Sequence, residues 1–281
     1  GRCYSSRTRR RRPARSAPYF IRSTPMTAPS PSWTPPYTLE ERIKYALIPP
    51  RLYMWRLIRK HLKKGEAELK LLPQFVARDR IAIDIGANKG VYTHLLSRIC
   101  QGVEAFEPNP KIYRILKRAL PVNVVAHQVA LSNRTGTAEL IVPMYGGGFS
   151  NQTASLNPRK RNDGARSIQV AQRTLDSYGF SNVGFIKIDV EGFERAVLEG
   201  ARETISRERP VLQIEIEEQH TGEPVAQSVE YIVNMGYDAF FARDGALHSF
   251  SEFDEAANRQ LIKTAGYINN FIFKPEDPGG A

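Results

Sequence analysis

The chain has little cysteine and no long apolar run. Its 281 residues include only Cys3 and Cys100, which form neither a disulfide framework nor a zinc-binding spacing. A small disulfide-stabilised or zinc-dependent fold is therefore excluded, and a reducing, cytoplasmic location fits best. No apolar stretch reaches the ~18–20 residues that a membrane-spanning helix requires. The length is sufficient for one sizeable hydrophobic core with room for extra segments.

Acidic residues are missing from the first 36 positions, which contain eight arginines. Positions 40–70 add a net charge of +5, so the remainder from Leu71 carries −2 although the whole chain carries +11. The basic excess thus lies in the N-terminal quarter of the chain. It gives no reason to expect that the larger C-terminal part grips nucleic acid.

Residues 1–37 have the composition of a disordered basic tail, because they are rich in Arg, Ser, Thr and Pro and show no apolar periodicity. An acid-free, Arg-rich start can be an organelle transit peptide. Its run of four arginines, Arg9 to Arg12, can also contact nucleic acid.

Residues 38–70 are expected to form a helical N-terminal extension. Thr38 can cap a first helix, a pair of prolines ends it, and a second helix is expected over residues 51–64. One apolar face of the second helix should contain Leu52, Trp55, Ile58 and Leu62. This face can pack on the following domain, or the basic helix can lie on an anionic membrane or on RNA.

A glycine-containing turn follows a short apolar strand at residues 81–85 and precedes a helix. A dinucleotide site would need the pattern G-x-G-x-x-G, which is missing, and here the acid Asp84 stands before the first glycine, Gly86. An acid at that place would repel a pyrophosphate but suits an ammonium group. S-adenosylmethionine carries an ammonium group and no phosphate. A second acid, Glu107, ends the next strand, where it can accept hydrogen bonds from ribose hydroxyls.

Strands and helices alternate from Asp79 onward. Strands are predicted at 81–85, 103–106 and 122–128, with helices at 91–100 and 110–119 between them. This alternation is typical of an α/β fold with a parallel sheet and helices on both faces, and residues 71–281 are expected to form that domain. Residues 138–142 come next, followed by a loop to about Arg166. The loop is long enough to be a substrate-binding lid, although plain surface disorder is the alternative.

The second stretch with chemical character is residues 183–194, in which an apolar run leads into Asp189. That carboxylate should lie at the carboxyl end of a strand, beside the turn marked by Gly86 and Gly90, where open α/β sheets bind ligands. Glu194 can be a residue of the first turn of the helix expected at 195–205.

A further strand, 210–216, contains Glu215, and an acid inside an apolar strand is costly unless it is paired. Lys187 is the expected partner, in an ion pair that is either structural or catalytic. His220 can be a general base, or it can be a solvated loop histidine. A helix at 228–234 and strands at 238–241 and 269–273 should close the chain at the antiparallel edge of the sheet.

Five blocks occur in a characteristic order: IDIGANKGVYTHLLSR, VEAFEPNP, VALSNRTGTAEL, TLDSYG and FIKIDVEGFERAVLEGA. Together they resemble the FkbM-type methyltransferases, a branch of the class I S-adenosylmethionine-dependent enzymes. The resemblance covers roughly residues 71–274 and leaves the N-terminal extension out. It implies a Rossmann-like seven-stranded sheet, mostly parallel, with the last strand antiparallel.

The resemblance also implies roles for individual residues. Asp84, Gly86, Asn88 and Gly90 would surround the methionine part of S-adenosylmethionine, and Glu107 would hold its ribose. Ala130, Leu131 and Ser132 would lie by the adenine. Asp189, a cofactor and catalytic residue at once, and Glu191 would face the transferred methyl group and the acceptor.

Family members are associated with O-methylation of sugars, polysaccharides and polyketide-type products, so a small-molecule or glycan hydroxyl acceptor is implied. Asp189 is the first candidate for the base that takes the hydroxyl proton, followed by Glu215 and His220. A divalent cation is possible, but no spacing indicates one and no metal ligand is assigned. The alternative is a nucleic-acid methyltransferase that uses the basic N-terminal arm. It is disfavoured by the slightly acidic domain and by the absence of an N-P-P-Y-like block. The oligomeric state is not predicted.

Overall fold

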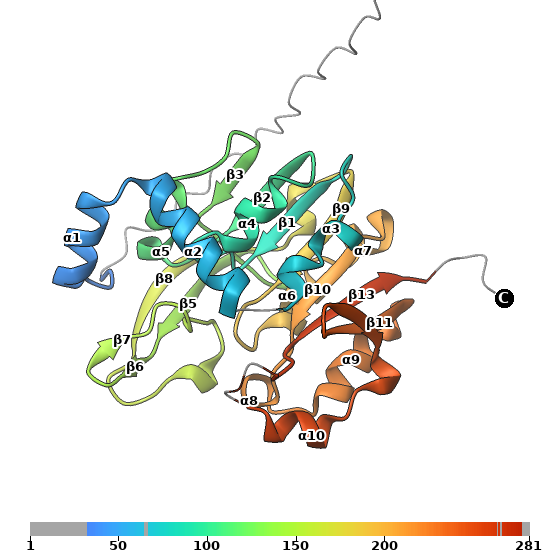
Figure 1. Cartoon of the computed structure of the whole chain (residues 1–281). Coiled ribbons are helices and arrows are strands. Elements are labelled where there is room, and N and C mark those ends of the chain that lie inside the picture. Colours follow the sequence, from blue (N-terminus) through green and yellow to red (C-terminus); the bar gives the residue numbers. More distant parts are fainter. Residues whose placement is uncertain (1–32, 65–66, 263, 265, 277–281) are drawn as a thin grey trace, which may run out of the picture.

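The computed structural model describes residues 33–64, 67–262, 264 and 266–276 (Figure 1). Most of the predicted tail therefore lies outside the described residues. Its last five residues are packed on the domain, whereas the sequence suggested disorder. Trp33 contacts Phe149 with ring centroids 4.8 Å apart, and the Lys111 ammonium donates to the Pro36 carbonyl at 2.8 Å. Lys111 is almost completely buried, so this contact fixes the segment firmly.

The main sheet has eight strands among the described residues, in the order β12-β11-β13-β10-β9-β1-β2-β3. The strands are β1 Ile81–Ile85, β2 Gly102–Phe106, β3 Val124–His127, β9 Val183–Ile188, β10 Val211–Glu215, β11 Tyr237–Arg243, β12 Ala246–Ser249 and β13 Asn270–Pro275. Neighbours from β10 to β3 run parallel, while β13 is antiparallel to both β10 and β11. The predicted parallel core and antiparallel last strand are present.

One detail of the predicted sheet is wrong. The count was seven, but β11 continues through Asp244 and Gly245, both at positive φ, into the extra edge strand β12. Such a D-G pair suits a tight hairpin turn. The two closing strands were expected at the antiparallel edge of the sheet and lie there as β11 and β13, with β13 between β10 and β11. Only long-range pairing decides that position.

A second sheet of three strands, in the order β4-β8-β5, lies beside the main one. It contains β4 Ala130–Leu131, β5 Gly136–Val142 and β8 Arg166–Arg173, and a small hairpin joins β6 Met144–Tyr145 to β7 Gly148–Phe149. The predicted strand at 138–142 is part of β5. Its partner β8 was missed, although Ile168 and Val170 alternate with polar residues and are both buried.

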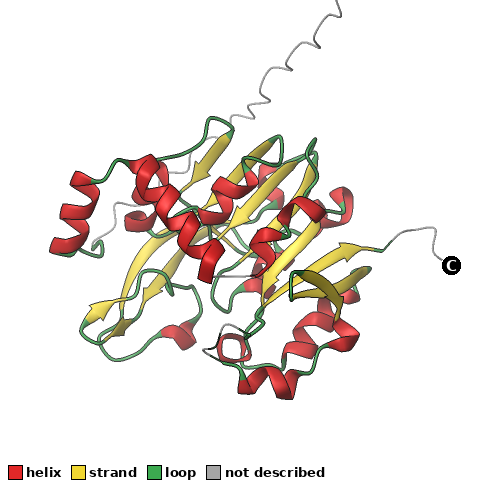
Figure 2. Ribbon diagram, in the orientation of Figure 1, coloured by secondary structure: helices red, strands yellow, loops and turns green. Residues whose placement is uncertain are grey.

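Helices cover both faces of the main sheet (Figure 2). The helices of the domain are α3 Leu72–Phe75, α4 Val91–Leu96, α5 Pro110–Lys117, α6 Glu194–Glu199, α7 Arg202–Glu208, α8 Glu218–Thr221, α9 Val225–Val233 and α10 Glu255–Gln260. In β1, Ile83 and Ile85 belong to one core cluster and Ala82 to the other, so both faces are buried. The helix predicted at 195–205 is divided at Gly200, where a Cβ would lie 1.9 Å from the Ser132 carbonyl oxygen.

The N-terminal extension folds as α1 Leu39–Leu47 and α2 Pro50–Lys64, close to the predicted bounds. Thr38 and Glu41 form a capping box at the start of α1. The predicted apolar face of α2 is partly wrong, because Leu52 and Trp55 are 40% and 49% exposed. Met54 and Ile58 are the residues that α2 buries. No helix in the described ranges is long and apolar enough to cross a membrane.

Candidate active site

A cavity of about 340 Å³ lies where β1, β2, β9 and β10 end, at the edge that open α/β sheets use for ligands. It is lined by eight of the residues named from the sequence: Gly86, Asn88, Glu107, Ala130, Leu131, Asp189, Glu191 and Glu215. Asp84 lines a second, adjoining cavity of about 110 Å³ that shares Gly86, Asn88 and Asp189 with the first. Gly90, Ser132 and His220 line neither of the two. The fold thus brings most of the predicted residues into one place.

The glycine turn is pressed directly against the second chemical stretch. Gly86 has φ +78°, and a Cβ there would stand 1.7 Å from the Asp189 carbonyl oxygen. The Asp189 N–H donates to the Ile85 carbonyl at 3.0 Å, which holds the two strand ends together. Gly90 has φ +89° and occupies the N-cap of α4. Because only glycine tolerates such approaches and torsions, these two positions explain the spacing of the motif.

Asp84 is completely buried at the end of β1. The Thr93 hydroxyl donates to its Oδ2 at 2.6 Å, while its Oδ1 has no hydrogen-bond partner among the described residues. Burial raises the pKa of this carboxyl above its ordinary value, although the Lys187 ammonium opposes the effect. A buried carboxylate oxygen that accepts no hydrogen bond destabilises the folded protein. A cationic group bound in the adjoining cavity would therefore be stabilised by this oxygen. The residues therefore fit a ligand that carries an ammonium group.

Glu107 lies at the end of β2 and forms a hydrogen bond with the backbone of the glycine turn. Its two oxygens accept the N–H groups of Asn88 at 2.9 Å and Asn109 at 2.8 Å. Burial raises the pKa of Glu107 to about 7, although these two hydrogen bonds lower it. Each carboxylate oxygen keeps a further lone pair for a ligand hydroxyl. Ala130 and Leu131 supply an apolar wall nearby, and Ser132 is fully buried.

Asp189 lies at the centre of an ionic group at the end of β9. The sequence named Glu215 as the partner of Lys187; the structure pairs the Lys187 ammonium with Asp189 Oδ2 at 2.7 Å. Burial alone would favour the neutral acid, yet the adjacent ammonium and a hydrogen bond from Glu215 hold the pKa of Asp189 below its ordinary value.

Glu215 has the opposite protonation preference. Burial and the charge of Asp189 raise its pKa well above the ordinary value, so it keeps a proton and donates it to Asp189. Asn269 Nδ2 donates to Glu215 Oε1 at 2.7 Å and to Glu217 Oε1 at 2.8 Å. The opposite pKa shifts of Glu215 and Asp189 thus favour a pair in which Glu215 is the proton donor and Asp189 the acceptor.

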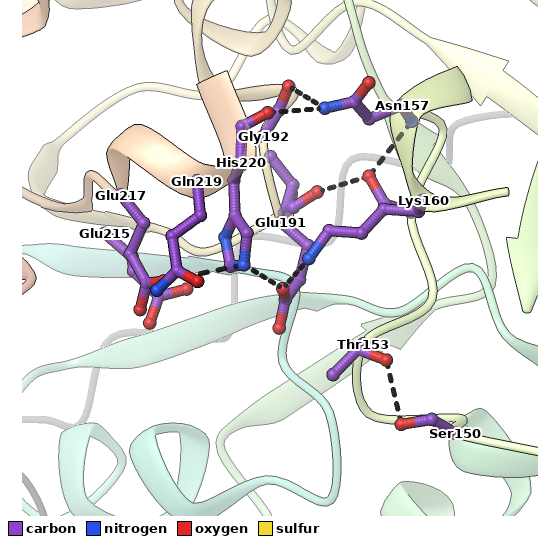
Figure 3. A network of polar contacts seen from close by, with 12 residues as sticks. Ser150, Thr153, Asn157, Lys160, Glu191, Gly192, Glu215, Glu217, Gln219 and His220 are labelled. Atoms are coloured by element: carbon purple, nitrogen blue, oxygen red, sulfur yellow. Dashed lines mark hydrogen bonds and ion pairs between the residues drawn. The ribbon is translucent and has the colours of Figure 1, made fainter. Parts of the chain in front are cut away.

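A second polar network holds Glu191 and His220 (Figure 3). The Lys160 ammonium lies 2.7 Å from Glu191 Oε2, and His220 Nε2 lies 3.4 Å from the same oxygen and 3.5 Å from Glu217 Oε2. His220 is therefore paired with two carboxylates and is not a freely solvated loop residue. Asn157 fixes its backbone, since Asn157 Nδ2 donates to the His220 carbonyl at 2.9 Å.

Sequence reasoning missed Lys160, Asn157, Glu217 and Asn269. The first two come from the long loop after β7, which forms one wall of the site and was identified only as a possible lid. A polar residue in a loop carries no periodic signal, so only its position in the fold identifies it.

Three carboxylates could together hold a metal ion. Single oxygens of Asp189, Glu191 and Glu215 lie within 4.8 Å of one another. Hard divalent cations prefer such oxygen ligands. In the structure the charges of these acids are already balanced by Lys187, Lys160 and the proton of Glu215. The donor set therefore suits a cation only after those partners move.

The model of the methyltransferase FkbM domain matches residues 84–267, which is most of the α/β domain and more than half of the chain. The chain belongs to this family. Membership supports methyltransferase activity and implies the use of S-adenosylmethionine, which the buried acid Asp84 and the cradle around Gly86 would accommodate. No curated protein sequence matches the chain significantly.

Solved structures resemble this chain only weakly. An FkbM methyltransferase from Methylobacillus flagellatus is 17% identical with a TM-score of 0.46, over 70% of this chain and 43% of that protein. An rRNA methylase from Streptococcus thermophilus is 13% identical (TM-score 0.42; 75% and 95% covered). A TehB-like methyltransferase from Corynebacterium glutamicum is 12% identical (TM-score 0.43; 81% and 98% covered). This chain spans less than half of the Methylobacillus protein, and none of these likenesses indicates a substrate.

Proposed function

We propose that the protein is an S-adenosylmethionine-dependent O-methyltransferase that acts on a hydroxyl group of a sugar, polysaccharide or polyketide-type molecule. The observation that supports this is that one cavity is lined both by the expected cofactor-binding residues and by the candidate catalytic carboxylates. The same space of about 340 Å³ touches Gly86, Glu107 and Ala130 on one side and the carboxylates Asp189, Glu191 and Glu215 on the other. A cofactor and an acceptor in this space would therefore meet at Asp189.

The chain's own residues suit each part of the cofactor. Asp84 would take the ammonium, and Gly86 and Asn88 would let the backbone approach the methionine chain. Glu107 would accept the ribose hydroxyls, and the apolar pair Ala130 and Leu131 would pack against the adenine. When bound, the cofactor supplies an electrophilic methyl group.

The acceptor side has to orient a hydroxyl and remove its proton. Asp189 is ionised because Lys187 and Glu215 donate to it, so it can accept a hydrogen bond from the acceptor hydroxyl. Its low pKa makes it an orienting group first and a proton acceptor late in the transfer. Holding the acceptor oxygen in line with the methyl carbon can supply several kcal/mol. As the acceptor loses its proton, Asp189 Oδ2 or Oδ1 would take it, beside the proton already held by Glu215.

The chemistry of the cavity favours a polyhydroxyl acceptor over nucleic acid. The carboxylates Asp189 and Glu191 line it and accept hydrogen bonds from hydroxyls, which the unprotonated oxygens of a phosphodiester cannot donate. The alternative, a nucleic-acid methyltransferase, depends on the basic side chains of α2, which lie on the N-terminal extension. The acidic cluster at Asp189 makes phosphate-rich substrates the weaker candidate.

Calorimetric titration tests the cofactor first. The wild type should bind S-adenosylmethionine with micromolar affinity and should not bind NADH, and Asp84→Ala should weaken binding at least tenfold. Methyl transfer to a panel of glycans, polyketide alcohols, amines and RNA then tests the acceptor. Turnover of hydroxyl acceptors that Asp189→Asn loses supports the proposal. Turnover of RNA or of amines alone would refute the O-methylation part and leave the cofactor assignment standing.

A further inference from the structure

Helix α2 contributes to the cavities although it lies before the residues that the family model matches. Leu57 and His61 line the smaller cavity beside Asp84, and His61 also lines the larger one. In Figure 1 this helix runs beside α4, and the two helices are in contact. The N-terminal extension thus forms part of the wall of the proposed cofactor site.

The packing of α2 explains why these two residues face inward. Met54 and Ile58 are 2% and 4% exposed, and Leu57 and His61 follow them at helical spacing. Positions i, i+3, i+4 and i+7 form one stripe along a helix. The buried anchors at the two earlier positions therefore fix which way His61 points.

The smaller cavity contains side chains suited to both charges of an amino-acid group. The cavity is lined by the acids Asp84 and Asp189 and by the bases Lys89, Lys187 and His61. Lys187 is committed to Asp189 at 2.7 Å. An amino-acid group brings both an ammonium and a carboxylate into such a space. The acids suit the ammonium, and the imidazole and the Lys89 ammonium are the donors for the carboxylate.

We infer that His61 of the N-terminal extension donates a hydrogen bond to the carboxylate of the amino-acid end of S-adenosylmethionine, and that Leu57 closes the cavity over the same end. The inference rests on the proposed function, because it assumes that S-adenosylmethionine is the ligand. It adds a binding residue outside the family domain, and it makes α2 part of the enzyme's active site.

Two ligands that differ only at the amino-acid end test this. S-adenosylhomocysteine carries the amino and carboxyl groups, whereas 5′-methylthioadenosine lacks both. In the full chain, His61→Ala should weaken S-adenosylhomocysteine at least tenfold and change the affinity for methylthioadenosine less than twofold. His61→Gln, which keeps a donor, should restore most of the affinity. Lys63→Ala, an exposed position on the same helix, should change neither.

The possible outcomes distinguish the proposed role of His61 from the proposal that the protein binds S-adenosylmethionine. Equal loss for both ligands, or no loss for either, would overturn the role of His61 and leave the cofactor assignment intact. If wild-type protein binds neither ligand, the proposed function itself fails, and this inference fails with it. A thermal melt of His61→Ala excludes unfolding as the cause, and His61→Gln gives the answer if the alanine variant does not fold.

The outward face of α2 supports a second, independent proposal. Leu52 and Trp55 are exposed there, next to exposed Arg51, Arg56 and Arg59, and α2 contains no acidic residue. Apolar side chains flanked by bases complement an anionic bilayer, whose headgroups attract the charges while the aromatic ring enters the interface. We propose that this face docks the protein on an anionic membrane surface.

Vesicle sedimentation tests the docking face. The full chain should sediment with vesicles of phosphatidylcholine mixed with phosphatidylglycerol and not with pure phosphatidylcholine. The double variant Leu52→Ala, Trp55→Ala should lose at least fivefold in binding, although all its bases remain. Equal binding by the double variant, or binding to single-stranded RNA with no binding to vesicles, would overturn the proposal.

Discussion

The buried acid Glu194 allows a direct test of the electrostatics around the active-site turn. It is the first residue of α6, only 7% exposed, and burial raises its pKa from the ordinary 4.5 to about 7. Its Oε1 accepts the N–H of Gly192 at 2.9 Å and that of Val190 at 3.4 Å. The substitution Glu194→Gln keeps an oxygen for both donors and removes the ability to ionise.

The direction in which the stability of the wild type changes with pH follows from the pKa values of Glu194 in the folded and unfolded chains. Below about pH 4.5 the carboxyl is protonated in both folded and unfolded chains, and above about pH 7 it is ionised in both. Between them the folded chain holds the extra proton, so the wild type loses stability as the pH rises. A difference of 2.5 pKa units corresponds to about 3 kcal/mol. Glu194→Gln should therefore be more stable than wild type by less than about 1 kcal/mol at pH 5 and by about 3 kcal/mol at pH 8.5.

Urea unfolding at pH 5, 7 and 8.5 measures this difference. With m between about 1 and 3 kcal/mol/M, the midpoint of the variant should exceed that of the wild type by roughly 1 M or more at pH 8.5. Glu203→Gln, at an exposed position of α7, is the matched control and should show no such gain. An advantage of Glu194→Gln that is the same at all three pH values would show that the carboxyl does not carry the expected proton.

Two other substitutions probe the same region. Gly86→Ala should destabilise the fold by several kcal/mol, because the alanine Cβ would collide with the Asp189 carbonyl oxygen and the residue has a positive φ. A large drop in melting temperature is the expected result, and an unchanged melting temperature would show that the alanine is accommodated without strain. Lys187→Met should raise the pKa of Asp189 and move the acid limb of the rate–pH profile to higher pH, and an unmoved limb would mean that Lys187 does not set the ionisation of Asp189.

Local signals predicted the parallel core of the sheet and the place of the site. The strands at 81–85 and 183–188 are apolar runs buried on both faces, and each leads into a candidate site residue at the same sheet edge. The extra strand β12 was missed because it is short, with only four residues. The partner strand β8 was missed although it is eight residues long and its buried Ile168 and Val170 alternate with polar residues. β12 pairs with β11 through a local hairpin, whereas β8 pairs with β5, which lies about thirty residues earlier and which a local pattern does not record.

The site itself was predictable only where a residue belongs to a motif. Asp189 follows an apolar strand and could be placed, but its partner could not, because Lys187 can reach either Asp189 or Glu215 until the backbone register is known. Lys160 comes from a loop without periodicity, so neither this residue nor its ion pair with Glu191 could be predicted from a sequence pattern. Motifs therefore predicted which backbone segments line the candidate site, while the pairing of its charged side chains could be read only from the structure.

His61 makes the wall of both cavities depend on the N-terminal extension. The family domain begins after α2, so a protein trimmed to the family match would retain Asp84, Glu107 and Asp189 and lose one wall of both cavities. Loss of activity on deleting residues 1–64 would then be expected for a small hydroxyl acceptor as well as for RNA. Such a deletion cannot distinguish the two acceptors, whereas the double change Leu52→Ala, Trp55→Ala alters only the outward face of α2 and leaves the wall in place. Substitution on one face of the helix at a time is therefore the experiment that separates cofactor binding from surface attachment.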